Sequence, residues 1–428
     1  MNEIFLIYLW ENKLLSFPLE TTDGQTLEVL YPGIRNLDSG PDFFNARIRI
    51  GSTLWAGNIE MHINSSDWYR HRHNSDAAYQ NIILHVVFAH DKEVFSNNLQ
   101  PIPTLELAGR FDDTLLLNYR RFTESRKWMA CEAHLHHVQR FTWLSWLDRM
   151  IVERLEDKTE LTLNLFEKTK HNWEDVFYSR LMQNFGFNTN EPAFMLLASK
   201  LPLNILLKHA DKLFQVEALL FGQAGLLDEH VQDDYPKMLK KEFEFLSVKY
   251  GLQPMKKELW KFMRMRPVNF PTVRLAQLAG LISRHGQMFA KFIHAPNTDS
   301  IKELLDISAS VYWNNHYRFD VPGDHKPKQL GDESINLILI NSVSQVLFAY
   351  GKYMNEEQHQ DKAMMILESM PPENNAVIKS FSERGVQAVN ALQSQALLHL
   401  RNHYCKPRRC LECRVGQLLI RPANSKND

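Results

Sequence analysis

Two neighbouring stretches near the N-terminus alternate apolar and polar residues with a period of two. Between positions 44 and 50, apolar side chains alternate with asparagine and arginine; between positions 58 and 64, isoleucine and methionine alternate with polar side chains. Such alternation is typical of β-strands with one buried face. A Gly-Ser-Thr turn separates them. The sequence therefore predicts a β-hairpin over 42–63 in which Glu60 and His62 share one face.

The hairpin also carries a candidate catalytic set, Asp42, Glu60 and His62. Pro41-Asp42 followed by Glu60-Met61-His62 resembles the PD-(D/E)XK signature of the restriction-endonuclease-like nucleases, with histidine in the position of lysine. The resemblance implies that Asp42 and Glu60 bind Mg²⁺ (or Mn²⁺) together with the Met61 carbonyl. It also implies that His62 activates the attacking water, and a neutral imidazole can accept a proton near neutrality. The alternative is a solvated strand face.

The whole chain resembles an uncharacterised family of bacterial proteins of similar length. The resemblance lies in the Gly-Pro-Asp-Phe start of the hairpin, the Ile-Glu-Met-His strand, the Trp-Tyr-Arg-His segment at 68–71, the apolar strand at 83–87 and a C-terminal cysteine cluster. This family implies no particular activity.

The chain length and the change of sequence pattern along the chain favour two domains. A chain of 428 residues exceeds the size of most single domains, and helical periodicity replaces strand patterns after Phe111. We therefore expect an α/β N-terminal domain with a restriction-endonuclease-like mixed sheet over 1–110 and a larger, mostly α-helical domain over 111–428. The apolar run 4–9 predicts a buried helix, and no run approaches the ~18 residues of a membrane span.

A second cluster of potential ligands follows the hairpin: His71, His73, Asp76 and, in the next predicted strand, His85. Histidine and aspartate at such spacing can bind zinc or manganese. Arg70, His71 and His73 are also suited to contact phosphates. The alternatives are a polar loop for His71 and His73 and a hydrogen-bonded core histidine for His85.

Three of the four cysteines, Cys405, Cys410 and Cys413, cluster near the C-terminus, and Cys131 is the fourth. Their spacing predicts a structural site for Zn²⁺ or an iron–sulfur cluster held by four thiolates. Some PD-(D/E)XK nucleases carry an iron–sulfur staple, although their cysteines occur in a different order. Reduced structural cysteines are the alternative. So few cysteines in a long chain favour a reducing compartment, and hence a cytoplasmic protein.

The net charge of −1 gives no global attraction to nucleic acid, so any such binding must depend on local patches. Basic residues interleaved with aromatics at 255–274 suit a phosphate backbone and stacked bases, although a solvated helix face is the usual explanation. The candidates there are Lys257, Lys261, Arg264 and Arg266.

Together these features predict a magnesium-dependent nuclease acting on DNA or RNA. Two other functions fit the same sequence. One is a non-nuclease metal hydrolase that uses the histidine and aspartate cluster. The other is a nucleic-acid-binding or scaffold protein whose nuclease core has lost activity, because the histidine lacks the fixed charge of lysine.

Overall fold

A computed structural model describes residues 1–227 and 231–422. It has an N-terminal part built on a mixed sheet, followed by a mostly helical region. Helices make up 54% of the structure. The expected order of an α/β part before a helical part is thus confirmed. The chain divides into two compact units, Met1–Trp146 with the described residues from Leu400 onward, and Leu147–His399. The sheet-containing unit therefore includes residues 111–146 and the C-terminal segment. The expected division at residue 110 had placed both in the helical unit.

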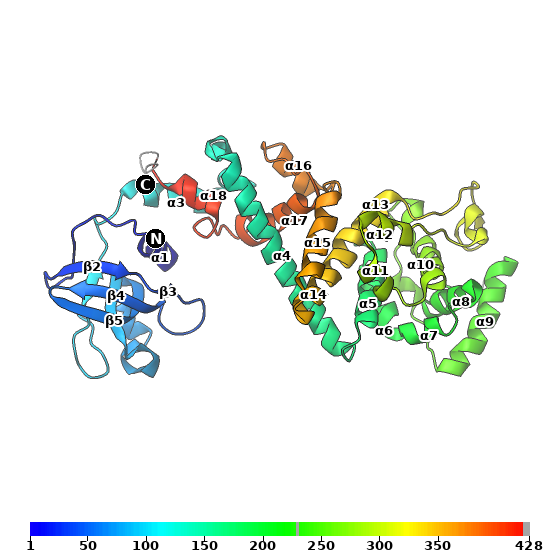
Figure 1. Cartoon of the computed structure of the whole chain (residues 1–428), viewed down its shortest axis with the longest axis horizontal. Helices are drawn as coiled ribbons and strands as arrows, with labels where there is room; N and C mark the ends of the chain where they lie inside the picture. Colours follow the sequence, from blue (N-terminus) through cyan, green and yellow to red (C-terminus); the bar gives the residue numbers. More distant parts are fainter. Residues whose placement is uncertain (228–230, 423–428) are drawn as a thin grey trace. The chain divides into compact units, whose positions relative to one another are not determined.

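The sheet of the first unit combines an antiparallel half and a parallel half (Figure 1). The strand order is β1-β2-β4-β5-β6-β7, with the short β3 also paired to β4. Pairing is antiparallel from β1 to β5 and parallel from β5 to β7, and β4 and β5 form the predicted hairpin. The strands are β1 (Leu19–Glu20), β2 (Thr26–Tyr31), β3 (Ile34–Arg35), β4 (Phe43–Ile50), β5 (Thr53–Asn64), β6 (Ile82–Ala89) and β7 (Thr104–Glu106).

Helix α1 (Glu3–Glu11) begins where the Asn2 side chain accepts the Phe5 N–H, and every side chain from Phe5 to Trp10 is buried. A helix that is apolar on all sides must be covered on all sides, and α1 packs on β5. The other helical segments of this unit are α2 (Asp67–Arg70), η1 (His73–Ser75), η2 (Ala77–Tyr79), α3 (Asp113–Thr123), η3 (Glu132–His137), the π-helical η8 (Leu400–Cys405) and α18 (Arg414–Ile420).

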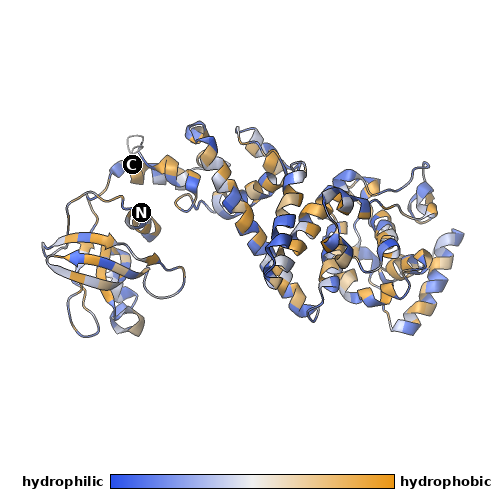
Figure 2. Cartoon of the chain, viewed as in Figure 1, coloured by the Kyte–Doolittle hydropathy of each residue, from blue (hydrophilic) through white to orange (hydrophobic). Residues whose placement is uncertain are grey.

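The second unit is an assembly of helices in which α8 and α10 are mostly buried. Figure 2 shows that most of its helices carry both hydrophobic and hydrophilic residues. Its elements include α4 (Arg140–Lys168), which begins in the first unit, α5 (Trp173–Phe185), α6 (Glu191–Lys200), α7 (Leu203–Leu207), α8 (Leu213–Gln223), α9 (Asp234–Tyr250), η4 (Lys257–Leu259), η5 (Pro267–Asn269), α10 (Pro271–His285), α11 (Phe289–His294), α12 (Thr298–Leu304), η6 (Val311–Asn315), β8 (His316–Arg318), β9 (Val321–Pro322), α13 (Asp332–Ile338), the π-helical η7 (Leu339–Val343), α14 (Ser344–Met354), α15 (Glu357–Ser369), α16 (Ala376–Ser382) and α17 (Ala391–His399).

One continuous helical stretch of the described chain, Asp332–Met354, is long and apolar enough to cross a membrane. This stretch is not an uninterrupted apolar run of the kind sought in the sequence, because it contains Asn336, Asn341 and Gln345. In addition, 78% of its most apolar window is buried inside the protein. A helix in the core of a globular unit is buried in this way.

Candidate metal centre

The candidate site forms where β5 and β6 run side by side and the chain between them returns over the sheet. Parallel strands need a crossover that passes a sheet face, and here α2, η1 and η2 make that crossover. The register places Glu60 beside His85. Trp68 of α2 is fully buried, and its ring lies 5.5 Å from that of His85 and 5.4 Å from that of His73. The crossover therefore covers the polar face of β5, which is not solvated.

The two hairpin carboxylates lie on the same side of the sheet and are each fixed by a backbone amide. The Met61 N–H donates to Asp42 Oδ2 (2.9 Å), and the Asp42 N–H donates to Glu60 Oε2 (3.2 Å). Glu60 is only 6% exposed. Its second oxygen, Oε1, lies 3.3 Å from His73 Nε2 and 3.6 Å from His62 Nε2. Glu60 thus joins the hairpin to the histidines of the crossover.

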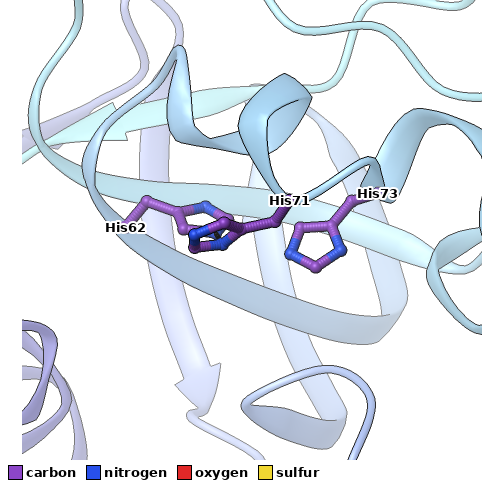
Figure 3. Close-up of side chains that lie close together, drawn as sticks. All are labelled: His62, His71 and His73. Atoms are coloured by element: carbon purple, nitrogen blue, oxygen red, sulfur yellow. Dashed lines mark hydrogen bonds between the residues drawn. The ribbon is translucent and has the colours of Figure 1, made fainter.

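Three histidines, His62, His71 and His73, lie close together, as Figure 3 shows. One ligand atom from each of His62, His71 and His73 lies within 4.8 Å of those of the other two. His62 Nε2 is 3.0 Å from His71 Nδ1, and the other ring nitrogen of His62 is hydrogen-bonded to His85 Nε2 at 2.8 Å. The His73 ring stacks on Tyr79 with centroids 3.8 Å apart. The ring positions are therefore fixed by contacts outside the ligand atoms themselves.

Burial changes the pKa values of the site residues. For the histidines the change favours the neutral form, which is the form that binds metal. Burial lowers the pKa of His62 to about 2 and that of His85 to about 3, and it lowers the pKa of His73. These rings are neutral at physiological pH, so each has one nitrogen with a free lone pair. Burial, with the neighbouring Glu60, raises the pKa of Asp42 to about 7, and burial raises that of Glu60 to about 8. A cation would offset this cost of ionising the carboxylates.

The donor spacing matches what one divalent ion needs. Ligands at ~2.0–2.1 Å from a tetrahedral ion lie roughly 3.3–3.4 Å from one another. Three pairs of donor atoms are close to this spacing: His62 Nε2 lies 3.0 Å from His71 Nδ1, and Glu60 Oε1 lies 3.3 Å from His73 Nε2 and 3.6 Å from His62 Nε2. His62 also makes the hydrogen bond through its second nitrogen that metal-binding histidines usually make, here to His85. The three histidines can thus hold a metal ion, with the Glu60 carboxylate beside His62 and His73.

The two clusters distinguished in the sequence are one site. The sequence separated Asp42, Glu60 and His62 from His71 and His73, because strand periodicity does not show where the crossover returns. Asp76 does not belong to the ligand group, since its carboxylate accepts the Ala78 N–H at the start of η2. His62 was expected to accept a proton from water, but it is 1% exposed and both its nitrogens contact other histidines. Its geometry is that of a ligand.

The other predicted contact residues are more dispersed. Arg70 is exposed and forms a 3.0 Å ion pair with Asp67. The basic candidates at 255–274 belong to the second unit, whereas the metal site belongs to the first. The aromatic faces there are also covered, because Trp260 is buried and Arg318 lies over Phe262 and Phe270. All four candidate cations are exposed: Lys257, Lys261, Arg264 and Arg266.

Two contributors were not recognised in the sequence. Tyr79 supports the His73 ring, and Glu3 of α1 is close enough to raise the pKa of both Asp42 and Glu60. An aromatic residue six positions after a histidine gives no usable pattern. Glu3 occupies an ordinary position for an acidic residue in the first turn of a helix, so nothing in the sequence connected it with the hairpin.

Fold and site together define a chain with an α/β unit bearing a buried histidine–carboxylate cluster, joined to a helical unit. The chain belongs to a family described as "Protein of unknown function (DUF2851)", whose model matches residues 3–376. This confirms membership of an uncharacterised family. Searches of curated proteins and of solved structures gave no significant match.

Proposed function

We propose that this protein is a metal-dependent hydrolase that cleaves phosphodiester bonds in nucleic acid at the Glu60–His62–His71–His73 site. The observation that carries the proposal is the convergence of His62, His71 and His73, with Glu60 Oε1 3.3 Å from His73 Nε2 and 3.6 Å from His62 Nε2. Buried side chains with strongly shifted pKa values, here Glu60 and His62, are typical of catalytic metal sites.

The donor set favours Zn²⁺ or Mn²⁺ over the Mg²⁺ expected from the sequence. Imidazole nitrogens suit zinc and other transition metals, whereas magnesium prefers carboxylates, carbonyls and water. An ion held by Glu60 and the histidines would polarise a phosphoryl oxygen and lower the pKa of a bound water. Asp42 lies at the edge of this group, where it can complete the ligand set or orient that water.

Phosphodiester substrates are supported by the strand order and by the surroundings of the site. The PD-(D/E)XK resemblance implies a mixed sheet, and the observed sheet combines antiparallel β2, β4 and β5 with a parallel β6, so we infer a restriction-endonuclease-like core. Arg70 and Arg72 are exposed on both sides of His71. Their guanidinium groups can hold a phosphate backbone across the site.

Metal-dependent cleavage of labelled nucleic acid tests the proposal. Chelator-treated protein is assayed on single- and double-stranded DNA and RNA after addition of Zn²⁺, Mn²⁺ or Mg²⁺. We expect cleavage to return with Mn²⁺ or Zn²⁺ and to fall at least about 100-fold in His73→Ala and Glu60→Gln, because a metal contributes several kcal/mol to stabilising the transition state. The control is His325→Ala, which removes an exposed histidine in the second unit.

Two other results of this experiment would contradict the proposal. A metal bound tightly without cleavage of any DNA or RNA would contradict the nucleic-acid substrate and favour another hydrolase reaction. Failure of the parent protein to bind metal would contradict the site and favour a scaffold role. A cytoplasmic location also remains part of the proposal, since all four cysteines are free thiols.

A further inference from the structure

The four cysteines come from two segments far apart in the chain that the structure places together. Arg408 joins these segments directly, since its Nη2 donates to the backbone carbonyls of Ser125 (2.7 Å) and Lys127 (2.5 Å), just before Cys131. The Arg401 guanidinium also lies 4.4 Å from the centre of the Trp128 ring. These contacts place the turn around 125–131 against the turn around 401–413, independently of the thiols.

The thiols themselves form one buried group. Cys131, Cys410 and Cys413 are each 8% exposed, Cys405 is partly buried, and all four are free. Burial raises the pKa of Cys131 to about 12, and the nearby Cys413 and Cys410 add to this shift. Burial also raises the pKa of Cys405, and Cys413, Cys131 and Cys410 add to that shift. Each thiol is therefore within electrostatic reach of the other three. Four buried thiols without disulfides form the ligand set of a metal centre.

The backbone around Cys410 and Cys413 is shaped for this purpose. The chain turns so tightly that a side chain at Gly416 would place its Cβ 2.1 Å from the Cys410 carbonyl oxygen. Glycine is therefore needed at 416 for the turn to close. The backbone N–H groups of Gly416 and Val415 are hydrogen-bonded to the Cys413 sulfur. Amide groups directed at a sulfur stabilise the thiolate form that binds metal.

The spacing of the sulfurs distinguishes a single ion from a larger cofactor. Four thiolates ~2.3 Å from a tetrahedral zinc ion lie about 3.8 Å from one another. In the described part of the chain, no three of these cysteine sulfurs all lie within 4.8 Å of one another, whereas ligand atoms of the three site histidines do. An iron–sulfur cluster separates its thiolates more widely than one ion does, because each thiolate binds a different iron or a different corner of the cluster.

We propose that Cys131, Cys405, Cys410 and Cys413 bind an iron–sulfur cluster of the [4Fe–4S] type that fastens the C-terminal segment to the sheet-containing unit. The cluster lies just before α18, which contacts helices α1 and α3 of this unit. Tyr8 Oη donates to the Gln417 carbonyl (3.4 Å), and Asn118 Nδ2 donates to the Ile420 carbonyl (3.1 Å). The centre is independent of the proposed hydrolase site and has a structural role.

The test is chemical analysis of full-length protein purified without oxygen. We expect about four iron atoms and four acid-labile sulfides per chain, as four cysteine ligands imply, together with broad visible absorption that bleaches in air. Cys410→Ser should lose at least half of the iron, whereas Arg414→Gln, an exposed neighbour, should retain it. If Cys410→Ser fails to fold, the iron, sulfide and absorbance of the parent protein still decide the question.

Zinc provides the sharpest alternative. Zinc that disappears in Cys410→Ser but remains in His73→Ala would overturn the cluster in favour of a single ion at the cysteines. Parent protein with neither iron nor zinc at the cysteines would overturn the metal centre altogether. Because the histidine site contributes no labile sulfide, loss of hydrolase activity and loss of the cluster remain separately measurable.

Discussion

At the scale of single residues, Glu60 links the two halves of the candidate site because its two oxygens have different partners. Oε2 accepts the Asp42 N–H, while Oε1 faces His62 and His73. Burial raises the pKa of Glu60 to about 8, so the metal-free protein holds a group that is costly to ionise. The same carboxylate must be ionised to bind a cation. Metal occupancy and proton binding therefore compete at one side chain.

This competition predicts an effect of pH on the stability of the metal-free protein. Because the folded pKa of Glu60 lies near 8 and that of an unfolded glutamate near 4.5, the folded state holds the extra proton between these values. Stability from this group is thus present at low pH and is lost as the pH rises toward 8.

Glu60→Gln removes that dependence. We expect its melting temperature, measured after chelation, to exceed that of the parent by a few degrees at pH 8 and by much less at pH 4.5. With Zn²⁺ or Mn²⁺ added at pH 8 the order should reverse, because the amide is a weaker ligand than a carboxylate. Equal melting curves for the two proteins at both pH values would show that Glu60 is not buried as described.

At the scale of elements, the hairpin could be predicted because its signal is local. Residues 44–50 and 58–64 alternate strictly, and the structure confirms β4 and β5 at these positions. The strand at 82–89 was also recognisable as an apolar run. The crossover was not predictable in detail, because it consists of α2 and two single 3₁₀ turns whose path is decided by the packing of Trp68. That path is what brings His71 and His73 to Glu60.

The contact between β5 and β6 predicts a destabilising substitution at Gly57. A Cβ at this position would lie 2.5 Å from Ile83 Cγ2 and 2.7 Å from the Asn81 carbonyl oxygen. Backbone atoms cannot move aside as a flexible side chain can, so β6 would shift away from β5. We expect Gly57→Ala to cost roughly 1–3 kcal/mol in chemical denaturation and to weaken metal binding, because Glu60 and His85 are in register across this strand pair.

The control is Gly323→Ala, where the added Cβ makes only ordinary contacts, the nearest at 3.7 Å to Tyr317 Cδ2. This substitution should leave both the unfolding curve and metal binding unchanged. If Gly57→Ala matches the control in both measurements, the close approach of β5 and β6 is not a constraint on the site.

At the scale of the whole molecule, the first unit is built from both ends of the described chain, and the second unit is inserted between them. The periodicity of the sequence suggested a simple succession of two domains instead. Local patterns carry no information about which distant segments pack together, so helix α18 gave no sign of its contacts with α1 and α3. The four cysteines were the one indication that the C-terminus returns to an earlier part of the chain.

This arrangement predicts that the sheet-containing unit depends on α18. A protein ending after Cys413 keeps all four cysteines but loses the buried side chains of Val415 and Ile420 and the contacts with Tyr8 and Asn118. Losing one well-packed aliphatic side chain costs about 2 kcal/mol or more. We therefore expect hydrogen exchange, measured by mass spectrometry, to accelerate in α1 and β5 at least about 30-fold, while α5 and α10 of the second unit stay protected. A protein ending after Pro422 is the control and should match the full chain. Unchanged protection of α1 in the shorter protein would mean that the first unit is complete without its C-terminal helix.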